Sequence, residues 1–267
     1  MLGKLMKYEW KATWKLLVPL NLFIVVMSIL AYITVQLDFF DSNNALVLTT
    51  GGILLMTCVF SMFVILVVSV IYLIYRFYTS VYGDEGYLLH TLPVDKHHII
   101  IAKAVASASW IILNIVLIYL SILFLFSTQE RLIETLTDGF QFYIETVNSY
   151  SKIGTFEIIM TLVASFFAML ARILKVSACV SLGQLASNHK VLSSIGFYYA
   201  IYIVQRIFML IYYMILTLVY ATSDYSYYRY TSFFNSSWEF TLLSSLIYCV
   251  IFYFLTWYVM DRKLNLD

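Results

Sequence analysis

Three positively charged side chains, Arg172, Lys175 and Arg206, lie inside long apolar stretches of this sequence. Arg172 precedes His189 by 17 residues and Arg206 follows it by 17, so in an antiparallel helical hairpin both would lie about 25 Å from the tip. Lys175 comes three residues after Arg172 and therefore shares its helix face. Such a cluster can bind an anionic group, for example a lipid headgroup. The alternative is that each side chain extends to the membrane boundary and hydrogen-bonds to tyrosines and carbonyls.

These cations have no acidic partner in sequence. Asp and Glu are absent from the interiors of the apolar stretches. Three cations facing lipid at the middle of a membrane would cost on the order of 8–10 kcal/mol. We therefore expect a shallow position in the membrane, a polar cavity, or a countercharge supplied by another subunit, a lipid phosphate or a bound solute.

The composition is that of a membrane protein. Of the 267 residues, 62% are hydrophobic and only 12% are charged, against about 25% charged in an average soluble domain. So few polar side chains could not cover the surface of a soluble protein of this size. This excludes a secreted, nucleic-acid-binding or ordinary cytosolic protein. The three cysteines lie in apolar runs without metal-ligand or disulfide spacing, and we expect them to be buried as small hydrophobic residues.

Six stretches have the roughly 20 apolar residues that a membrane-spanning helix needs: 16–36, 52–75, 100–126, 156–187, 191–220 and 239–260. Alternation of period two is absent, so the sequence predicts an all-α membrane protein with six transmembrane helices in a single domain over 1–267. With both termini in the cytosol, ten Lys and Arg residues fall in the inner segments and three in the outer ones. The excess of positive charge favours this orientation over the reverse.

Two further helices are expected outside the spans. In residues 1–15, four lysines recur every three or four positions and Leu and Trp occupy much of the rest, which predicts an interfacial elbow helix lying in the headgroup plane. Its function is either to steady the cytosolic side or only to anchor the topology. In residues 127–155, apolar side chains at helical spacing predict an extracellular amphipathic helix over the outer mouth.

Residues 76–99, between the second and third spans, are too polar to cross a membrane. Gly83 and Gly86 bracket Asp84 and Glu85 and permit a tight bend, and Pro93 ends any helix before it. A short amphipathic element whose ends are tied to two membrane helices can present side chains to a soluble partner and transmit force. The alternative is an ordinary re-entrant or surface loop.

The same segment carries apolar side chains and a helix start. Tyr87, Leu88 and Leu92 follow the bend and supply apolar anchors. Asp95 can cap a helix that begins near Lys96 and continues into the third span.

Three motifs resemble those of the ABC-2 type transporter permeases, especially the group from low-GC Gram-positive bacteria. They are Tyr82-Gly-Asp-Glu-Gly-Tyr-Leu-Leu-His-Thr-Leu-Pro-Val-Asp-Lys with Ile-Ala-Lys103 after it, Ser181-Leu-Gly-Gln-Leu-Ala-Ser-Asn-His-Lys190, and Leu5-Met-Lys-Tyr-Glu-Trp-Lys-Ala-Thr-Trp. In that family the segment between the second and third spans docks on the ATPase subunit. The resemblance therefore implies a cytosolic coupling segment at 76–99, with these contact residues: Tyr82, Gly83, Asp84, Glu85, Gly86, Tyr87, Leu88, Leu92 and Pro93. Asp95-Lys96 departs from the family, where Ser-Arg is frequent.

The resemblance implies the permease subunit of an ABC exporter in a bacterial plasma membrane, paired with an identical or paralogous second permease. Relatives suggest a peptide or another amphiphile as substrate, in antimicrobial peptide or drug resistance or in self-immunity. Arg172, Lys175 and Arg206 would then line the translocation path or contact lipid. No GxxxxGK[ST] phosphate-binding loop occurs, so ATP and Mg²⁺ are expected in a separate ATPase subunit. No catalytic or metal site is expected, and the alternative function is a membrane sensor that transports nothing.

Overall fold

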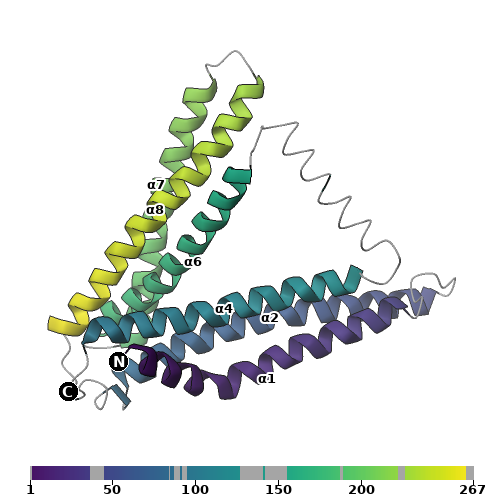
Figure 1. The fold of residues 1–267 in the computed structure, drawn as a ribbon, viewed down its shortest axis with the longest axis horizontal. Coiled ribbons are helices and arrows are strands. Elements are labelled where there is room, and N and C mark those ends of the chain that lie inside the picture. The colour runs from purple at the N-terminus through teal and green to yellow at the C-terminus, as the bar shows by residue number, and fades with distance from the viewer. Residues whose placement is uncertain are drawn as a thin grey trace. The chain divides into compact units, whose positions relative to one another are not determined.

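A computed structural model describes residues 2–36, 45–83, 85–86, 91, 95–126, 141, 155–186, 189–221 and 226–262. These residues form long α-helices and, within the described ranges, no strand (Figure 1). The six long helices are α1 (Leu2–Gln36), α2 (Ala45–Tyr82), α4 (Lys96–Phe126), α6 (Thr155–Gly183), α7 (Lys190–Ala221) and α8 (Ser226–Arg262).

All six helices are long and apolar enough to cross a membrane, which confirms the predicted multi-pass membrane protein. Most of them extend beyond the apolar stretches. The second stretch, for example, was expected over 52–75, whereas α2 covers Ala45–Tyr82. Hydropathy marks only the part of a helix that suits hydrocarbon, while the backbone hydrogen bonds continue into the polar layers on either side. The orientation of the termini across the membrane stays a prediction.

The N-terminal residues belong to one continuous helix. The structure places 2–15 in α1 together with the first span, and Pro19 lies inside this helix. Figure 1 shows α1 bent along its length, and a proline inside a helix is a common cause of a bend because it removes one backbone hydrogen bond. The predicted lysine face is exposed, and Leu5 and Trp10 on the other face are partly buried. A separate elbow helix in the headgroup plane stays a prediction, and the predicted outer helix at 127–155 falls almost wholly outside the described residues.

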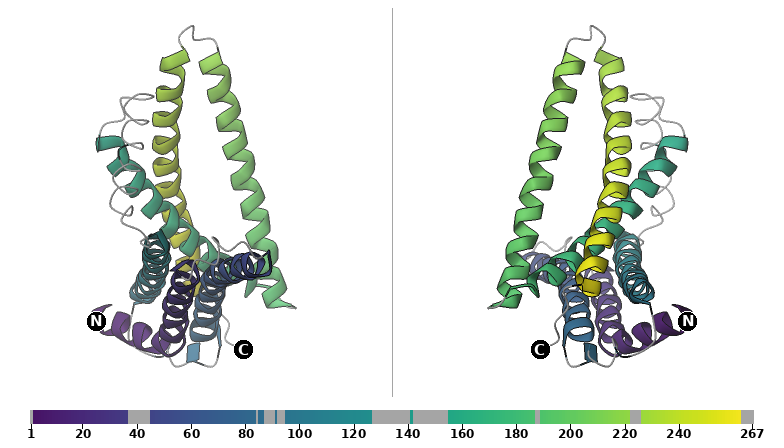
Figure 2. Two further views of the ribbon diagram at one scale, coloured as in Figure 1. Left: turned by 90° about the vertical axis from the view of Figure 1, so that its right-hand side faces the viewer. Right: turned by 90° about the vertical axis from the view of Figure 1, so that its left-hand side faces the viewer.

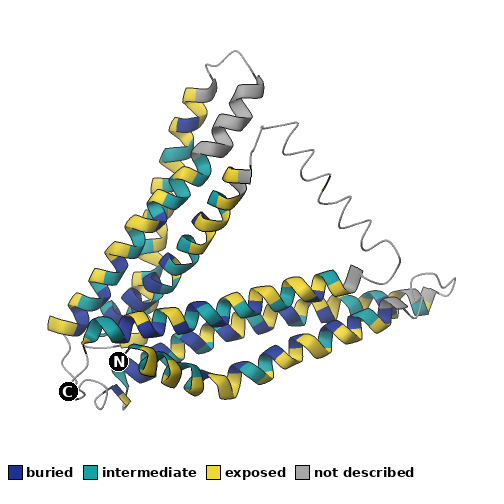
Figure 3. Cartoon of the chain, in the orientation of Figure 1, coloured by how far each residue is buried: buried dark blue, intermediate teal, exposed yellow. Residues whose placement is uncertain are grey.

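The chain divides into two compact units, one within Met1–Phe77 and Val105–Phe140 and the other within Tyr78–Ala104 and Gln141–Asp267. The first unit has two apolar core clusters. Figure 3 shows that buried and exposed positions alternate along its helices. Leu17, Leu73 and Trp110 form one cluster, and the ring of Trp10 stacks on Trp110 at 4.8 Å between centroids. The other cluster consists of Ile24 on α1 with Met62 and Ile65 on α2, and the partly buried Leu117 and Ile118 of α4 pack against it.

A layer of polar side chains separates these two clusters. Asn21 on α1, Ser69 on α2 and Asn114 on α4 are each at most 7% exposed, and each lies in sequence between residues that belong to, or pack against, the two clusters. Asn21 Nδ2 donates to the carbonyl of Leu17 at 2.8 Å. Within the described residues, no hydrogen-bond partner is recorded for Asn21 Oδ1, Ser69 Oγ or either polar atom of the Asn114 amide. Buried polar atoms of this kind oppose folding unless they find partners.

Replacing Asn114 with leucine is expected to raise the free energy of unfolding by about 1–2 kcal/mol, because it removes a desolvated amide and keeps the volume. Thermal unfolding of the purified chain in detergent measures this. Asn114→Ala removes the same amide but leaves a void, so it should be less stable than Asn114→Leu. Equal and large destabilisation by both replacements would show that the Asn114 amide has a hydrogen-bond partner. The amide would then stabilise the fold, contrary to this prediction.

In the second unit, α6 packs mainly against α8, with α7 beside them. Small residues recur every seven positions along α6, where Ala164, Ala171 and Ala178 are buried. Ser245, Phe252 and Val259 recur at the same interval on α8 and are also buried. Small side chains let two membrane helices approach closely. The helix α7 packs more against α6 than against α8, and Figure 2 shows α7 and α8 diverging along their length. Only 6% of the most apolar part of α7 is buried, against 22% for α6 and α8.

The predicted hairpin between the fourth and fifth spans is present, but its connection is longer than expected. The sequence placed the fourth span up to residue 187, whereas α6 ends at Gly183. The chain then forms a tighter turn, in which the amides of Gln184 and Leu185 donate to the carbonyls three residues before them at 3.1 and 3.0 Å. Apolar residues continue past the end of the helix, and for this reason hydropathy placed the boundary too late.

Candidate functional site

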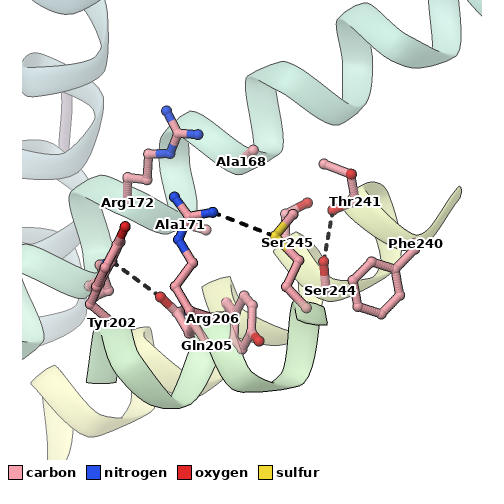
Figure 4. A pocket seen from close by; sticks show the side chains of 13 residues that line it. Ala168, Ala171, Arg172, Tyr202, Gln205, Arg206, Phe240, Thr241, Ser244 and Ser245 are labelled. Atoms are coloured by element: carbon pink, nitrogen blue, oxygen red, sulfur yellow. Dashed lines mark hydrogen bonds between the residues drawn. The ribbon is translucent and has the colours of Figure 1, made fainter. Parts of the chain in front are cut away.

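The second unit contains a cavity of about 190 Å³ that is lined by α6, α7 and α8 and open on one side (Figure 4). All three cations singled out in the sequence line it: Arg172 and Lys175 from α6 and Arg206 from α7. The equal sequence distance of Arg172 and Arg206 from His189 therefore corresponds to a shared position in the hairpin. Of the described residues that line the cavity, none is acidic.

Lys175 is the most enclosed of the three cations. Its side chain is only 6% exposed, and its Nζ donates a hydrogen bond to Gln205 Oε1 at 3.2 Å. The same nitrogen lies 4.6 Å from the ring centroid of Tyr198 and 5.6 Å from that of Tyr202. The negative faces of aromatic rings attract cations. Lys175 is thus held by neutral groups, and within the described residues no negative charge balances its own. Contact with tyrosines was expected from the alternative in which the cations hydrogen-bond to neutral groups.

The two arginines are more exposed and their guanidinium groups are accessible. Arg206 Cζ lies 5.0 Å from the ring centroid of Tyr202, and its Nη1 lies 3.8 Å from the sulfur of Met209. Figure 4 shows Arg172 and Arg206 reaching the cavity from two different helices. A guanidinium presents several N–H donors in a planar fork, which suits the oxygens of a carboxylate or a phosphate. The arrangement can therefore bind an oxyanion.

The sequence reasoning missed the wall that α8 contributes. Thr241, Ser244, Ser245 and Tyr248 line the cavity and lie at helical spacing on one face of α8. The hydroxyls of Thr241 and Ser245 each donate to a backbone carbonyl of their own helix at 2.8 Å, and that of Ser244 does so at 3.2 Å. The sequence does contain a pattern that could have indicated this wall. Polar residues recur at i, i+3, i+4 and i+7 in an otherwise apolar stretch, which places them on one face of a helix.

The predicted coupling segment is described in part. Tyr82, Gly83, Glu85 and Gly86 are placed, whereas Asp84, Tyr87, Leu88, Leu92 and Pro93 lie outside the described residues. The amide of Gly83 donates to the Thr79 carbonyl at 3.2 Å, and that of Gly86 donates to the Gly83 carbonyl at 2.8 Å. A Cβ on Gly83 would lie 2.6 Å from the Thr79 carbonyl oxygen, and one on Gly86 would contact the Val81 carbonyl. The predicted tight bend is therefore present, and it needs both glycines.

A scan of protein-family models, a search of curated proteins and a search of solved structures found no match to this chain. The roles of these residues are therefore inferred from their geometry, their chemistry and the motif resemblance.

Two residues of the segment 76–99 contact the helices that line the cavity. At the end of α2, the hydroxyl of Tyr82 donates to Ser181 Oγ on α6 at 2.6 Å. At the start of α4, Lys96 Nζ lies 3.0 Å from Asp261 Oδ1 on α8. The helix start predicted near Lys96 is confirmed, and the Asp95 carbonyl accepts from the amide of His98 at 2.9 Å. A displacement of this segment would therefore reach α6 and α8 directly.

His97 strengthens the connection to α8. Its ring stacks on Trp257 at 5.1 Å between centroids, and its Nδ1 lies 2.6 Å from the hydroxyl of Tyr253. Both partners lie in the last part of α8, near Asp261. The start of α4 is thus attached to α8 by an ion pair, a ring stack and a hydrogen bond.

Replacing Tyr82 with phenylalanine is expected to lower the free energy of unfolding by about 1 kcal/mol, because the fully buried hydroxyl of Ser181 loses its donor. Thermal unfolding in detergent measures the change. Tyr199→Phe is the control, since this tyrosine is 60% exposed on α7. If both replacements shift the unfolding temperature equally, the hydroxyl contact between α2 and α6 contributes nothing specific.

Proposed function

We propose that this chain is the permease subunit of an ABC exporter, forming a translocation path with a second permease and driven by separate ATPase subunits. The proposal rests on the motif at 82–96 and on the six apolar helices that accompany it. The coupling segment at 76–99 is the docking site for the ATPase in this proposal. A peptide or another amphiphile is the substrate class, on the resemblance alone.

The observation that carries the proposal is the attachment of the coupling segment to the walls of the cavity. Tyr82 bonds to Ser181 on α6, and Lys96 bonds to Asp261 on α8. These two helices, with α7, line the cavity that holds the three cations. An ATPase that pressed on the coupling segment would thereby move α6 and α8 and change access to the cavity.

The arrangement in the membrane follows from the charge distribution and the helix surfaces. With both termini in the cytosol of a bacterium, the coupling segment lies on the side where ATP is available. The weakly buried α7 leaves apolar surface for lipid or for the second permease. ATP and Mg²⁺ bind in the partner subunit, because the sequence lacks a phosphate-binding loop.

Affinity purification from the native membrane, followed by identification of the bound proteins, tests the proposal. We expect a stoichiometric ATPase that carries a phosphate-binding loop and is lost from the variant Asp84→Ala/Glu85→Ala. The control Glu130→Ala/Glu134→Ala removes two acids from the predicted outer face and should retain the ATPase. An ATPase that stays bound to the first variant would move the docking site elsewhere. Its absence from the unaltered chain would contradict the transporter and favour the membrane sensor.

A further inference from the structure

We infer that the cavity between α6, α7 and α8 binds the phosphate headgroup of a membrane amphiphile whose apolar chain remains in the bilayer. The inference goes beyond the proposed function, because it requires neither an ATPase nor transport. It follows from the charge of the cavity, its size, its depth and the apolar surface beside it.

The charge of the cavity calls for an anion. Arg172, Lys175 and Arg206 contribute three positive charges, and the described lining residues include no carboxylate. Gln205 and the rings of Tyr198 and Tyr202 orient Lys175 but leave its charge uncompensated. A buried cation is costly unless a negative group accompanies it.

The number and geometry of the donors favour a phosphate. Each guanidinium can engage two oxygens in a planar fork, and the ammonium of Lys175 adds a further donor. The oxygens of a phosphate point in tetrahedral directions, so Arg172 and Arg206 can both donate to it from two sides, whereas the two oxygens of a carboxylate lie in one plane. The hydroxyls of Thr241 and Ser244 on the opposite wall donate to carbonyls of α8, so the three cations supply the hydrogen bonds to the phosphate (Figure 4).

The size of the cavity limits what can enter. Its volume of about 190 Å³ accommodates a phosphate with a small polar attachment, whereas a whole lipid or a folded peptide is far larger. The cavity is open on one side, so the rest of a ligand can lie outside it.

The surface of α7 can accommodate that remainder. Ile203, Phe208 and Leu210 flank Arg206 on α7 and are at least half exposed. An acyl chain can lie on this surface while its headgroup reaches the cations. A free inorganic phosphate has no apolar part that could contact this surface. This favours an amphiphile as the source of the phosphate.

The depth of the site also points to a bound anion. Arg206 lies near the midpoint of α7, a helix of 32 residues. An untilted helix of this length measures about 48 Å, so a hydrocarbon core of about 30 Å placed anywhere along it leaves the backbone of Arg206 at least about 6 Å inside that core. The backbone of Arg206 therefore lies inside the hydrocarbon core in every such placement.

Lipid binding to the purified full chain in maltoside micelles, measured by native mass spectrometry, tests the inference. The probe is dioleoyl phosphatidylglycerol, and dioleoylglycerol is the same molecule without the phosphate group. We expect the phosphatidylglycerol to bind at least about tenfold more tightly, as one charge-assisted hydrogen bond would provide. Millimolar inorganic phosphate should not displace it. Displacement would identify free phosphate as the ligand and overturn the assignment to an amphiphile.

The variant Arg172→Gln/Lys175→Gln/Arg206→Gln should raise the Kd for phosphatidylglycerol by at least about tenfold. The variant Arg172→Lys/Arg206→Lys keeps every charge but loses both forks, and should raise it by about threefold. This second variant decides the matter if the first does not fold. The control Lys4→Gln/Lys7→Gln/Lys11→Gln removes as many charges from the exposed face of α1 and should leave the Kd unchanged.

Three results would overturn the inference. One is equal binding of phosphatidylglycerol by the wild type and both cavity variants. Another is an equal loss of binding in the α1 control, which would show attraction to net charge alone. The third is equal binding of dioleoylglycerol. Because no ATPase takes part in the measurement, each of these results leaves the proposed function to be judged separately by its own experiment.

Discussion

Replacing Gly183 with alanine is expected to lower the free energy of unfolding by about 2–3 kcal/mol, although alanine is ordinarily the better helix former. Gly183 ends α6 where α7 turns back against it. An added Cβ would lie 2.7 Å from both the Lys190 carbonyl oxygen and the Ser194 amide nitrogen, and would contact Ser194 Oγ. Two of these three atoms belong to the backbone, so the helices themselves must separate. Thermal unfolding of the full chain in detergent measures the effect.

Gly196 provides a matched control within the same hairpin. It lies in α7, and a Cβ there would meet nothing described within 4 Å. Gly196→Ala should therefore be neutral or should stabilise the protein by up to about 1 kcal/mol, as expected for an open helical site. The two replacements thus have opposite expected signs. If Gly183→Ala is as well tolerated as Gly196→Ala, the close approach of α6 and α7 at this point is wrong.

The membrane-spanning helices could be predicted from the sequence because lipid imposes a simple requirement. About 20 apolar residues are needed to cross the hydrocarbon core, and no soluble core would tolerate six such stretches with so little charge. The ends of the helices could not be predicted in the same way. Leu185 and Ala186 continue the apolar pattern after α6 has ended at Gly183, because hydropathy reports the environment and not the backbone hydrogen bonds.

The part of the candidate site that could be predicted from the sequence consists of residues whose type is rare in a membrane helix. Arg172, Lys175 and Arg206 stand out because a cation inside an apolar stretch is costly. The equal spacing of Arg172 and Arg206 about His189 predicted that these two lie at the same depth. The hydroxyl wall of α8 does not stand out. Serine and threonine bond to carbonyls of their own helix and are therefore tolerated in membrane helices without any function. That Ser244 and Ser245 face the cations depends on how α8 is rotated against α6, which the sequence of α8 alone does not specify.

The polar layer of the first unit illustrates the same limit. Asn21, Ser69 and Asn114 are unremarkable single polar residues in three different stretches. They form a layer because Leu17, Leu73 and Trp110 pack together on one side of it and Ile24, Met62 and Ile65 on the other. These residues lie at one level because of how the three helices are positioned along one another. The sequence of any single helix does not specify that positioning.

The effect of Lys175→Met on stability is expected to change sign when anionic lipid is added. Without anionic lipid, Lys175→Met should raise the free energy of unfolding by about 1–2 kcal/mol, because it removes a buried cation that has only neutral partners and two neighbouring arginines. With phosphatidylglycerol at 100 times its Kd, the wild type should gain about 2.7 kcal/mol from binding. The variant should gain much less, so the wild type becomes at least as stable.

Lys103→Met is the matched control for this dependence of stability on the lipid. Lys103 is also a buried lysine, 5% exposed, but it lies outside the cavity and donates to Ser80 Oγ at 2.6 Å. Its replacement changes a buried ammonium to the same thioether, so any general effect of lipid on buried lysines would appear in both variants. We expect the stability difference between Lys103→Met and the wild type to be the same with and without phosphatidylglycerol. Equal stabilisation of Lys175→Met and the wild type by that lipid would show that the cation does not contact its headgroup.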